Sequence, residues 1–225
     1  MATWIVHLRI ADEFIKRNIV PDAYKCEFIC GSLAPDCGYG KKDSNGEFTP
    51  PPEITHWTPG GCKIFCEYQR FYDTYLKNRI KNNTYYFYLG YYIHLITDVL
   101  WSASIYMSTK LRFNEECRNN PDFINTIKKD WYGLDFLFLK NTEYFEPYAI
   151  LQQVKAVDDY LPYYEKDQLT TQIRCIAEYY KNGLNKTYDF SFKYLTEKEM
   201  AAFLDTATEL ILTKLWWGAT KSHLY

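Results

Sequence analysis

A histidine and an aspartate stand four residues apart in a segment that has no basic residues. The pair is His94 and Asp98, and residues 82–109 around it contain no Lys or Arg. In a helix this spacing places both side chains on one face, about one turn apart. A carboxylate buried there needs a compensating cation, which is either a basic side chain from a distant part of the chain or a metal ion. Taken alone, the pair is better explained by a hydrogen bond between the two side chains in the core, because this spacing is common in helices.

Other histidines and a further aspartate favour the metal interpretation. His7 falls on the apolar face of the first helical pattern, residues 3–18, and Asp36 and His56 lie in a long loop. Imidazole and carboxylate ligands together suit zinc and related first-row metals. Three of the four histidines are therefore assigned to one centre, and His223 is assigned to a frayed C-terminal tail.

The loop that carries Asp36 and His56 runs from residue 32 to residue 61 and is rich in Gly and Pro. A structureless connection of about 30 residues is uncommon in a compact domain and is usually functional. We therefore expect it to fold back over a site, a linker between two domains being the alternative.

The elements around the loop follow a helical period, and no segment alternates for long enough to require a sheet. The second helix should open at Pro21 and close at Gly31. Thr196 and Glu199 form a capping box before the last helix. The other helices are expected at residues 62–78, 83–108, 120–139, 146–156, 167–182 and 196–217. We predict an all-α fold: a single multi-helix domain over residues 1–225 with a buried central helix.

The apolar stretch at residues 85–107 is long enough to cross a bilayer. Six tyrosines along it, and His94 and Asp98 at its middle, favour a helix buried inside a protein instead. Charged residues interrupt the N-terminal segment before an export signal could form, and seven cysteines, an odd number, suit a reducing compartment. We expect a cytoplasmic protein without a transmembrane segment.

The cysteines allow a competing metal interpretation, since two pairs are each spaced by one helical turn and could form a four-thiolate zinc site. The pairs are Cys26 with Cys30 and Cys62 with Cys66. Structural zinc sites more often place two residues between paired cysteines, so we expect reduced thiols in the core.

Four segments, in order along the chain, resemble the zinc-dependent phospholipase C family, and especially its small cytosolic bacterial members of unassigned substrate. They are Trp4-Ile-Val-His7, Gly31-Ser-Leu-Ala-Pro-Asp36, Thr55-His56-Trp57 and Tyr88-Leu-Gly-Tyr-Tyr-Ile-His94-Leu-Ile-Thr-Asp98-Val-Leu-Trp101. The resemblance covers about the first 140 residues. Each motif is weak alone, and the four in sequence form a strong signal.

The resemblance implies a role for each matched residue. Asp36, His56 and His94 would bind one zinc ion, with Asp36 as the candidate general base. Asp98 would bridge to a second zinc ion held by His7. Two cations close together need a shared anion, which a bridging carboxylate supplies.

The chain also departs from the family pattern. Secreted members use the amino group of an N-terminal tryptophan as a ligand, whereas Trp4 is internal here. They hold a third zinc ion with two further histidines, and this chain has no histidine between His94 and His223. Asp130 is carried as a replacement metal ligand, with a capping or surface role as the alternative.

The expected function is that of an enzyme, a zinc-dependent phosphoric ester hydrolase with a phospholipase C-like phosphodiesterase activity. Its cofactor would be one or two zinc ions, or another divalent transition metal. The expected partner is a small-molecule or lipid phosphoester, with peripheral membrane contact left open. A net charge of −2 gives no bulk support for nucleic acid binding. A catalytically inactive metal-binding protein and a single-strand nuclease remain as alternatives, and the oligomeric state is left open.

Overall fold

Helices make up most of this computed structural model, which describes residues 1–40, 47–186, 188 and 191–221. The predicted all-α class is confirmed. Within the described residues the sheet content is one antiparallel pair of two-residue strands, β1 (Tyr39–Gly40) and β2 (Phe48–Thr49). His223 lies outside the described residues.

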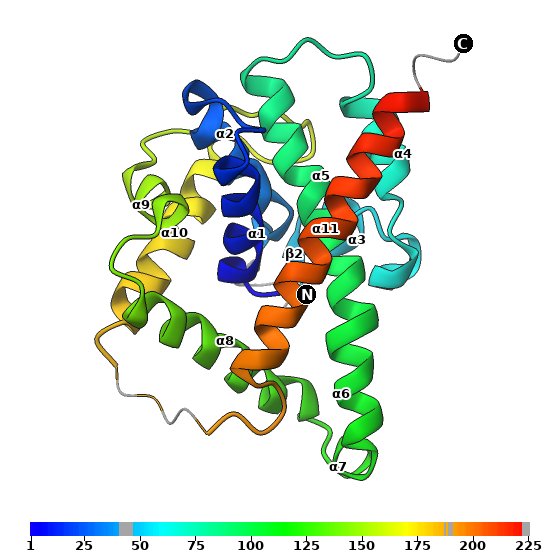
Figure 1. Ribbon diagram of the computed structural model, residues 1–225, viewed down its shortest axis with the longest axis vertical. Coiled ribbons are helices and arrows are strands. Elements are labelled where there is room, and N and C mark those ends of the chain that lie inside the picture. The colour runs from blue at the N-terminus through cyan, green and yellow to red at the C-terminus, as the bar shows by residue number, and fades with distance from the viewer. Residues whose placement is uncertain (41–46, 187, 189–190, 222–225) are drawn as a thin grey trace.

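Three helices form the part of the fold that positions the candidate site: α1 (Trp4–Lys16), α2 (Lys25–Leu33) and α5 (Asn83–Trp101). Figure 1 shows α1 and α2 side by side, with α5 to their right running through the middle of the molecule. The side chains of α5 are buried from Tyr86 through Asp98. The prediction of a buried helix around His94 is therefore confirmed.

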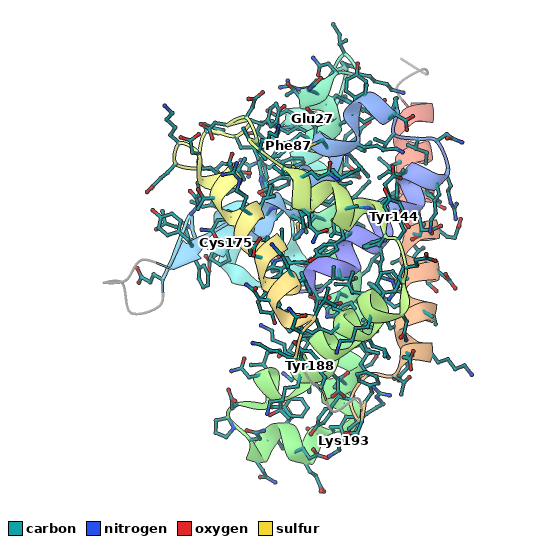
Figure 2. The ribbon with its side chains drawn as sticks, turned by 90° about the vertical axis from the view of Figure 1, so that its left-hand side faces the viewer. Glu27, Phe87, Tyr144, Cys175, Tyr188 and Lys193 are labelled. Atoms are coloured by element: carbon teal, nitrogen blue, oxygen red, sulfur yellow. The ribbon has the colours of Figure 1, made fainter. Side chains whose placement is uncertain are left out.

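Glycines let α2 and α5 approach each other closely. A Cβ atom on Gly90 would lie 2.1 Å from the carbonyl oxygen of Phe28, and one on Gly31 would lie 1.9 Å from the carbonyl oxygen of Phe87. Figure 2 places Phe87 near Glu27, where the two helices meet. The expectation that Gly31 ends the second helix is wrong, because α2 continues to Leu33 and Gly31 serves the helix contact instead. Pro21 precedes a 3-10 turn, η1 (Asp22–Tyr24), and not the α-helix itself.

The long loop folds into short elements. It contains the 3-10 helices η2 (Ala34–Asp36) and η3 (Pro59–Gly61), the two strands, and α3 (Pro52–Thr55). Its end runs into a further 3-10 turn, η4 (Lys63–Phe65), and then α4 (Tyr68–Tyr75). The helix expected at residues 62–78 is thus limited to its second half.

The central helix continues beyond Trp101 as a π-helix, η5 (Ser102–Tyr106), and then as α6 (Met107–Arg112). A short α7 (Asn114–Asn119) follows, which the sequence analysis did not predict, and α8 (Phe123–Asn141) lies across the lower part of the molecule in Figure 1. Across the described residues no helix is long and apolar enough to span a membrane.

The C-terminal helices complete the fold: α9 (Glu146–Gln153), α10 (Gln168–Gly183) and α11 (Glu197–Lys221). In Figure 2 α11 runs along one side of the molecule. The predicted capping box is confirmed, because the Glu199 N–H donates to the Thr196 hydroxyl (3.2 Å) and the Thr196 N–H donates to the Glu199 carboxylate (2.8 Å). One core of buried apolar side chains extends from α1 to α11.

Candidate metal centre

Two helices bring one half of the centre together. His7 projects from α1, while His94 and Asp98 project from α5, and all three are buried. The imidazole rings of His7 and His94 stack with their centroids 3.7 Å apart. The Nε2 atom of His7 lies 3.6 Å from Oδ1 of Asp98, and the Nε2 atom of His94 lies 3.8 Å from Oδ2 of Asp98. These three residues can offer one ligand atom each within 4.8 Å of one another.

The long loop supplies the other half. Asp36 ends η2 and His56 follows α3, and with His94 they form a second group of potential ligands within 4.8 Å. The Nε2 atom of His56 is 3.0 Å from Oδ1 of Asp36 and 3.6 Å from Oδ2 of Asp98. His94 belongs to both groups, so the two halves form one continuous cluster.

The orientation of His94 follows from the contact between α2 and α5. Its Nδ1–H donates to the carbonyl oxygen of Ser32, 2.8 Å away, in a position reached only because Gly90 lets the helices meet. This hydrogen bond leaves Nε2 without a proton and directed at the carboxylates. It is the arrangement in which a histidine binds a metal ion through Nε2 while the other ring nitrogen is held by the protein.

Hydrogen bonds from α5, from α10 and from the segment just before α10 hold the loop in place. Tyr91 donates to the carbonyl oxygen of Thr55, next to His56. Tyr164 donates to the carbonyl oxygen of Ala34 (2.6 Å), two residues before Asp36, and Gln168 donates to those of Cys37 and Thr49 (both 2.8 Å). The loop that carries two of the candidate ligands is therefore tied to the surrounding structure on both sides.

Several buried polar atoms of the cluster have no hydrogen-bond partner among the described residues. They are both ring nitrogens of His7, Nε2 of His94 and Oδ2 of Asp36. Unpaired buried groups of this kind are costly, and they are rare in native structures unless a water or an ion satisfies them. A second sign comes from His56, whose Nδ1 lies 3.2 Å from the Pro52 carbonyl oxygen. If Nδ1–H donates there, the lone pair of Nε2 faces a carboxylate oxygen, and a cation between them removes the repulsion. The donor set thus fits a metal ion.

The ionisation states suit a cation as well. Burial raises the pKa of Asp98, but Lys63 and the nearby chain amino group outweigh it and hold this pKa well below its usual range. Asp36 behaves similarly, since burial is outweighed by His56 and His94 and its pKa is lowered. Burial and the neighbouring His7 lower the pKa of His94 well below its ordinary value. Two anionic carboxylates and an unprotonated imidazole are the forms that bind metals.

A basic side chain does reach the centre, and it comes from a part of the chain that the sequence analysis did not consider. The Nζ atom of Lys63 lies 2.8 Å from Oδ2 of Asp98, and the backbone N–H of Ala2 donates to Oδ1 (2.9 Å). Lys63 is thus a basic side chain from a distant part of the chain, which was one of the two cations expected for a buried Asp98. Lys63 sits in the short turn η4, in a stretch expected to be helical, and no spacing signal marks it.

The structure brings together five of the six predicted ligands: His7, Asp36, His56, His94 and Asp98. Asp130 is not among them. It lies on α8, where its carboxylate accepts a hydrogen bond from the backbone N–H of Tyr194 (2.6 Å), which is the capping role named as the alternative. The cysteines are free thiols and belong to neither group of potential ligands.

The residues that orient the ligands were also missed by the sequence analysis. Ser32, Tyr164 and Gln168 act through contacts with residues far away in the sequence, and no local pattern indicates such contacts. Tyr91, which donates to the carbonyl oxygen of Thr55, was also absent from the predicted site. The sequence feature that could have indicated Tyr91 was its position near His94 on the same helix.

Comparison with known proteins gives one match. No curated protein and no solved structure matches this chain. The sequence profile of the family described as "Zinc dependent phospholipase C" matches residues 6–207, which include the five clustered candidate ligands. The chain therefore belongs to the zinc-dependent phospholipase C family.

Proposed function

We propose that this protein is a zinc-dependent hydrolase of phosphate esters, with phosphodiesters as its main substrates. Family membership supports a metal-dependent hydrolase of the phospholipase type. The observation that carries the proposal is the set of buried, unpartnered nitrogen and oxygen atoms on His7, His94 and Asp36, which converge with His56 and Asp98.

We assign one zinc ion to Asp36, His56, His94 and Asp98, with His7 and Asp98 available for a second. When bound, the metal would supply Lewis acidity at the phosphoryl group and lower the pKa of a bound water. Another divalent transition metal could fill the same donor set. Asp130 remains in the proposal only as a ligand to be tested.

The chain's own residues prepare the site for this chemistry. Oδ1 of Asp36 lies 3.0 Å from Nε2 of His56, while Oδ2 has no hydrogen-bond partner among the described residues, so Oδ2 can orient a water molecule and take its proton as general base. The hydrogen bond from His94 to Ser32 fixes the tautomer of His94 before any ligand arrives. Attack on phosphorus is in line, and no covalent intermediate with the protein is required.

Metal content and hydrolysis of a chromogenic phosphodiester, measured together, test the proposal. The wild-type protein should take up zinc at micromolar free metal and hydrolyse the diester, and His94→Ala should lose both. Asp130→Asn is the matched control: it should keep its zinc, and a loss of zinc would identify Asp130 as a ligand. A wild-type protein that binds no transition metal under these conditions defeats the proposal.

One observation favours a second candidate, a metal-binding protein without turnover. Lys63 already neutralises part of the charge on Asp98. This candidate predicts a zinc-loaded protein that is inert toward phosphatidylcholine, single-stranded DNA and a generic diester. Activity on any one of the three excludes it and identifies the substrate class, including the nuclease alternative.

A further inference from the structure

Lys63 occupies the boundary between the metal centre and a cavity. Its ammonium group contacts Asp98, yet its side chain keeps 16% of its exposure, compared with 2% for the side chain of Asp98. The same lysine lines a cavity of about 270 Å³ between η3 and η4 on one side and η5, α6 and α8 on the other. A ligand in this cavity can therefore reach the ammonium group without passing through the protein core.

The lining of this cavity suits a ligand that has both an anionic group and an apolar group. Ile64, Tyr106, Met107 and Ile124 provide apolar walls, and among the described lining residues only Lys63 carries a side-chain charge. Trp131 also lines the cavity, and its buried indole N–H has no hydrogen-bond partner in the part of the chain that the structure describes. An anionic group would find a cation and an unused donor here.

Lys63 also changes the net charge of the metal centre. Among the side chains of the centre, Asp36 and Asp98 bring two negative charges, and the ammonium of Lys63 cancels one of them. One divalent ion then leaves the cluster with a single excess positive charge, which an anionic phosphoryl group can neutralise. A second divalent ion near Asp98 would have to enter beside an ammonium group 2.8 Å from the shared carboxylate, and the two cations would repel each other.

We propose, resting on the proposed function, that Lys63 is the second cation of this centre and binds an oxygen of the substrate's phosphoryl group, taking the place of a second metal ion. In the absence of ligand it pairs with Asp98. When an anion enters from the cavity, the flexible lysine stem lets the ammonium group contact both the carboxylate and the phosphoryl oxygen. The uncharged substituent of the ester then lies against the apolar walls.

The test measures the affinity of the zinc-loaded, full-length protein for inorganic phosphate, by calorimetry, together with the zinc content per chain. Lys63→Met keeps the apolar stem and removes the charge. We expect phosphate affinity to fall about tenfold or more, as for the loss of a charge-assisted hydrogen bond, while zinc per chain stays equal or rises. Lys63→Arg should keep affinity within about threefold, because it preserves the charge.

Lys77→Met serves as the matched control, since Lys77 is an exposed lysine whose partner is Asp73. It should change neither quantity. The role of Lys63 is contradicted if Lys63→Met binds phosphate within about twofold of wild type, or if the folded variant loses its zinc, which would make Lys63 a support for the ligands.

Circular dichroism verifies that the Lys63 variants are folded, and Lys63→Gln replaces Lys63→Met if the latter is not. Failure of both to fold contradicts the proposal, because a ligand-binding lysine in a surface turn is not needed for folding. If the wild type takes up no zinc, the proposed function fails, and the role of Lys63 fails with it. If the wild type binds zinc and hydrolyses the diester while the Lys63 variants bind phosphate normally, only the role of Lys63 fails.

Discussion

Two buried aspartates of this protein have pKa values that are shifted in opposite directions. Asp98 and Asp135 are 1% and 2% exposed. Asp98 faces Lys63 and the imidazoles of the centre, and its pKa lies well below the usual range despite burial. Asp135, on α8, accepts hydrogen bonds from the hydroxyl groups of Thr3 and Tyr180 (both 2.7 Å). Burial dominates there and raises its pKa to about 7.

The difference shows that burial alone does not decide whether a carboxyl group is charged. Cations and imidazoles keep Asp98 anionic, so the centre holds a charge that a metal ion can neutralise. Hydroxyl donors satisfy the oxygens of Asp135 without supplying a positive charge, so its neutral form persists to much higher pH. Asp98 is therefore in the form that can bind a cation, whereas Asp135 links α8 to Thr3 and to Tyr180 on α10 through hydrogen bonds.

The largest expected effect comes from replacing the two aspartates, one at a time, by asparagine, which has nearly the same shape but cannot carry a negative charge. Asp98→Asn should lower zinc affinity by at least about a hundredfold and abolish diester hydrolysis, since it removes a carboxylate that we propose as a zinc ligand. Asp135→Asn should leave zinc affinity within about threefold. Competition with a chromogenic chelator measures both. Equal losses in the two variants would show that Asp135 belongs to the centre.

The next largest effect is on the helix contact that orients His94. In Gly90→Ala the new Cβ atom would lie 2.1 Å from the Phe28 carbonyl oxygen and 2.7 Å from the Ser32 nitrogen, so α2 must move. We expect a loss of about 3 kcal/mol in the free energy of unfolding. Zinc binding should also weaken, because the partner of His94 moves with α2.

Gly40→Ala is the control for this substitution, as nothing lies within 4 Å of the Cβ atom it would add. Its unfolding free energy should match the wild type within about 0.5 kcal/mol. Urea denaturation of the three proteins gives the values. A stable Gly90→Ala protein with unchanged zinc affinity would mean that the close helix approach does not position the centre.

The helical half of the centre was largely predictable from the sequence, because the spacing of His94 and Asp98 and the apolar face around His7 are local patterns. The buried helix α5, the capping box of α11 and the metal-ligating role suggested for the loop all rest on such patterns or on family resemblance. Asp130 shows the limit of this approach. It was expected to replace a missing metal ligand, but its carboxylate accepts a hydrogen bond from the backbone N–H of Tyr194 and does not meet the other candidate ligands.

Lys63 could not be predicted, because its partner Asp98 is 35 residues away and the turn that carries it was expected to be helical. The positioning of the loop by Tyr164 and Gln168 depends on contacts that span more than a hundred residues. Gly31 was misassigned for a related reason: a glycine near a helix end and a glycine at a helix contact have the same local sequence pattern.

The pH dependence of stability should separate the two aspartates. An unfolded aspartate has a pKa of about 3.9, whereas Asp135 in the folded protein has one of about 7. The folded state therefore binds more protons between these values, and the free energy of unfolding should fall as the pH rises through this window. Asp98, with its pKa lowered, acts oppositely: it stabilises above about pH 4 and loses this contribution as the pH falls further.

Denaturation of chelator-treated protein at several values between pH 5 and pH 7 tests this. Over that interval the wild type should lose about 2 kcal/mol relative to Asp135→Asn, which cannot ionise at this position. Using the difference between the two proteins cancels the titration of the histidines. Parallel curves for the two proteins would contradict the assigned environment of Asp135.

The smallest effect concerns two tyrosines that play the same part in the two regions. Tyr164 donates to the Ala34 carbonyl oxygen beside the metal centre, and Tyr180 donates to Asp135. Each change to Phe removes one buried hydrogen bond and should cost about 1 kcal/mol in the free energy of unfolding. The two substitutions should have different effects on zinc affinity, because only Tyr164 holds the segment that ends in Asp36.

We expect Tyr164→Phe to weaken zinc binding by about tenfold, as for other residues that orient metal ligands. Tyr180→Phe should leave zinc binding unchanged and raise the pKa of Asp135 further, since the lost hydrogen bond favoured its anionic form. Because the two variants should lose similar amounts of stability, each serves as the control for the other. If both variants lost zinc equally, loosening of the whole fold would explain the result, and the separation between the two carboxylate environments would be lost.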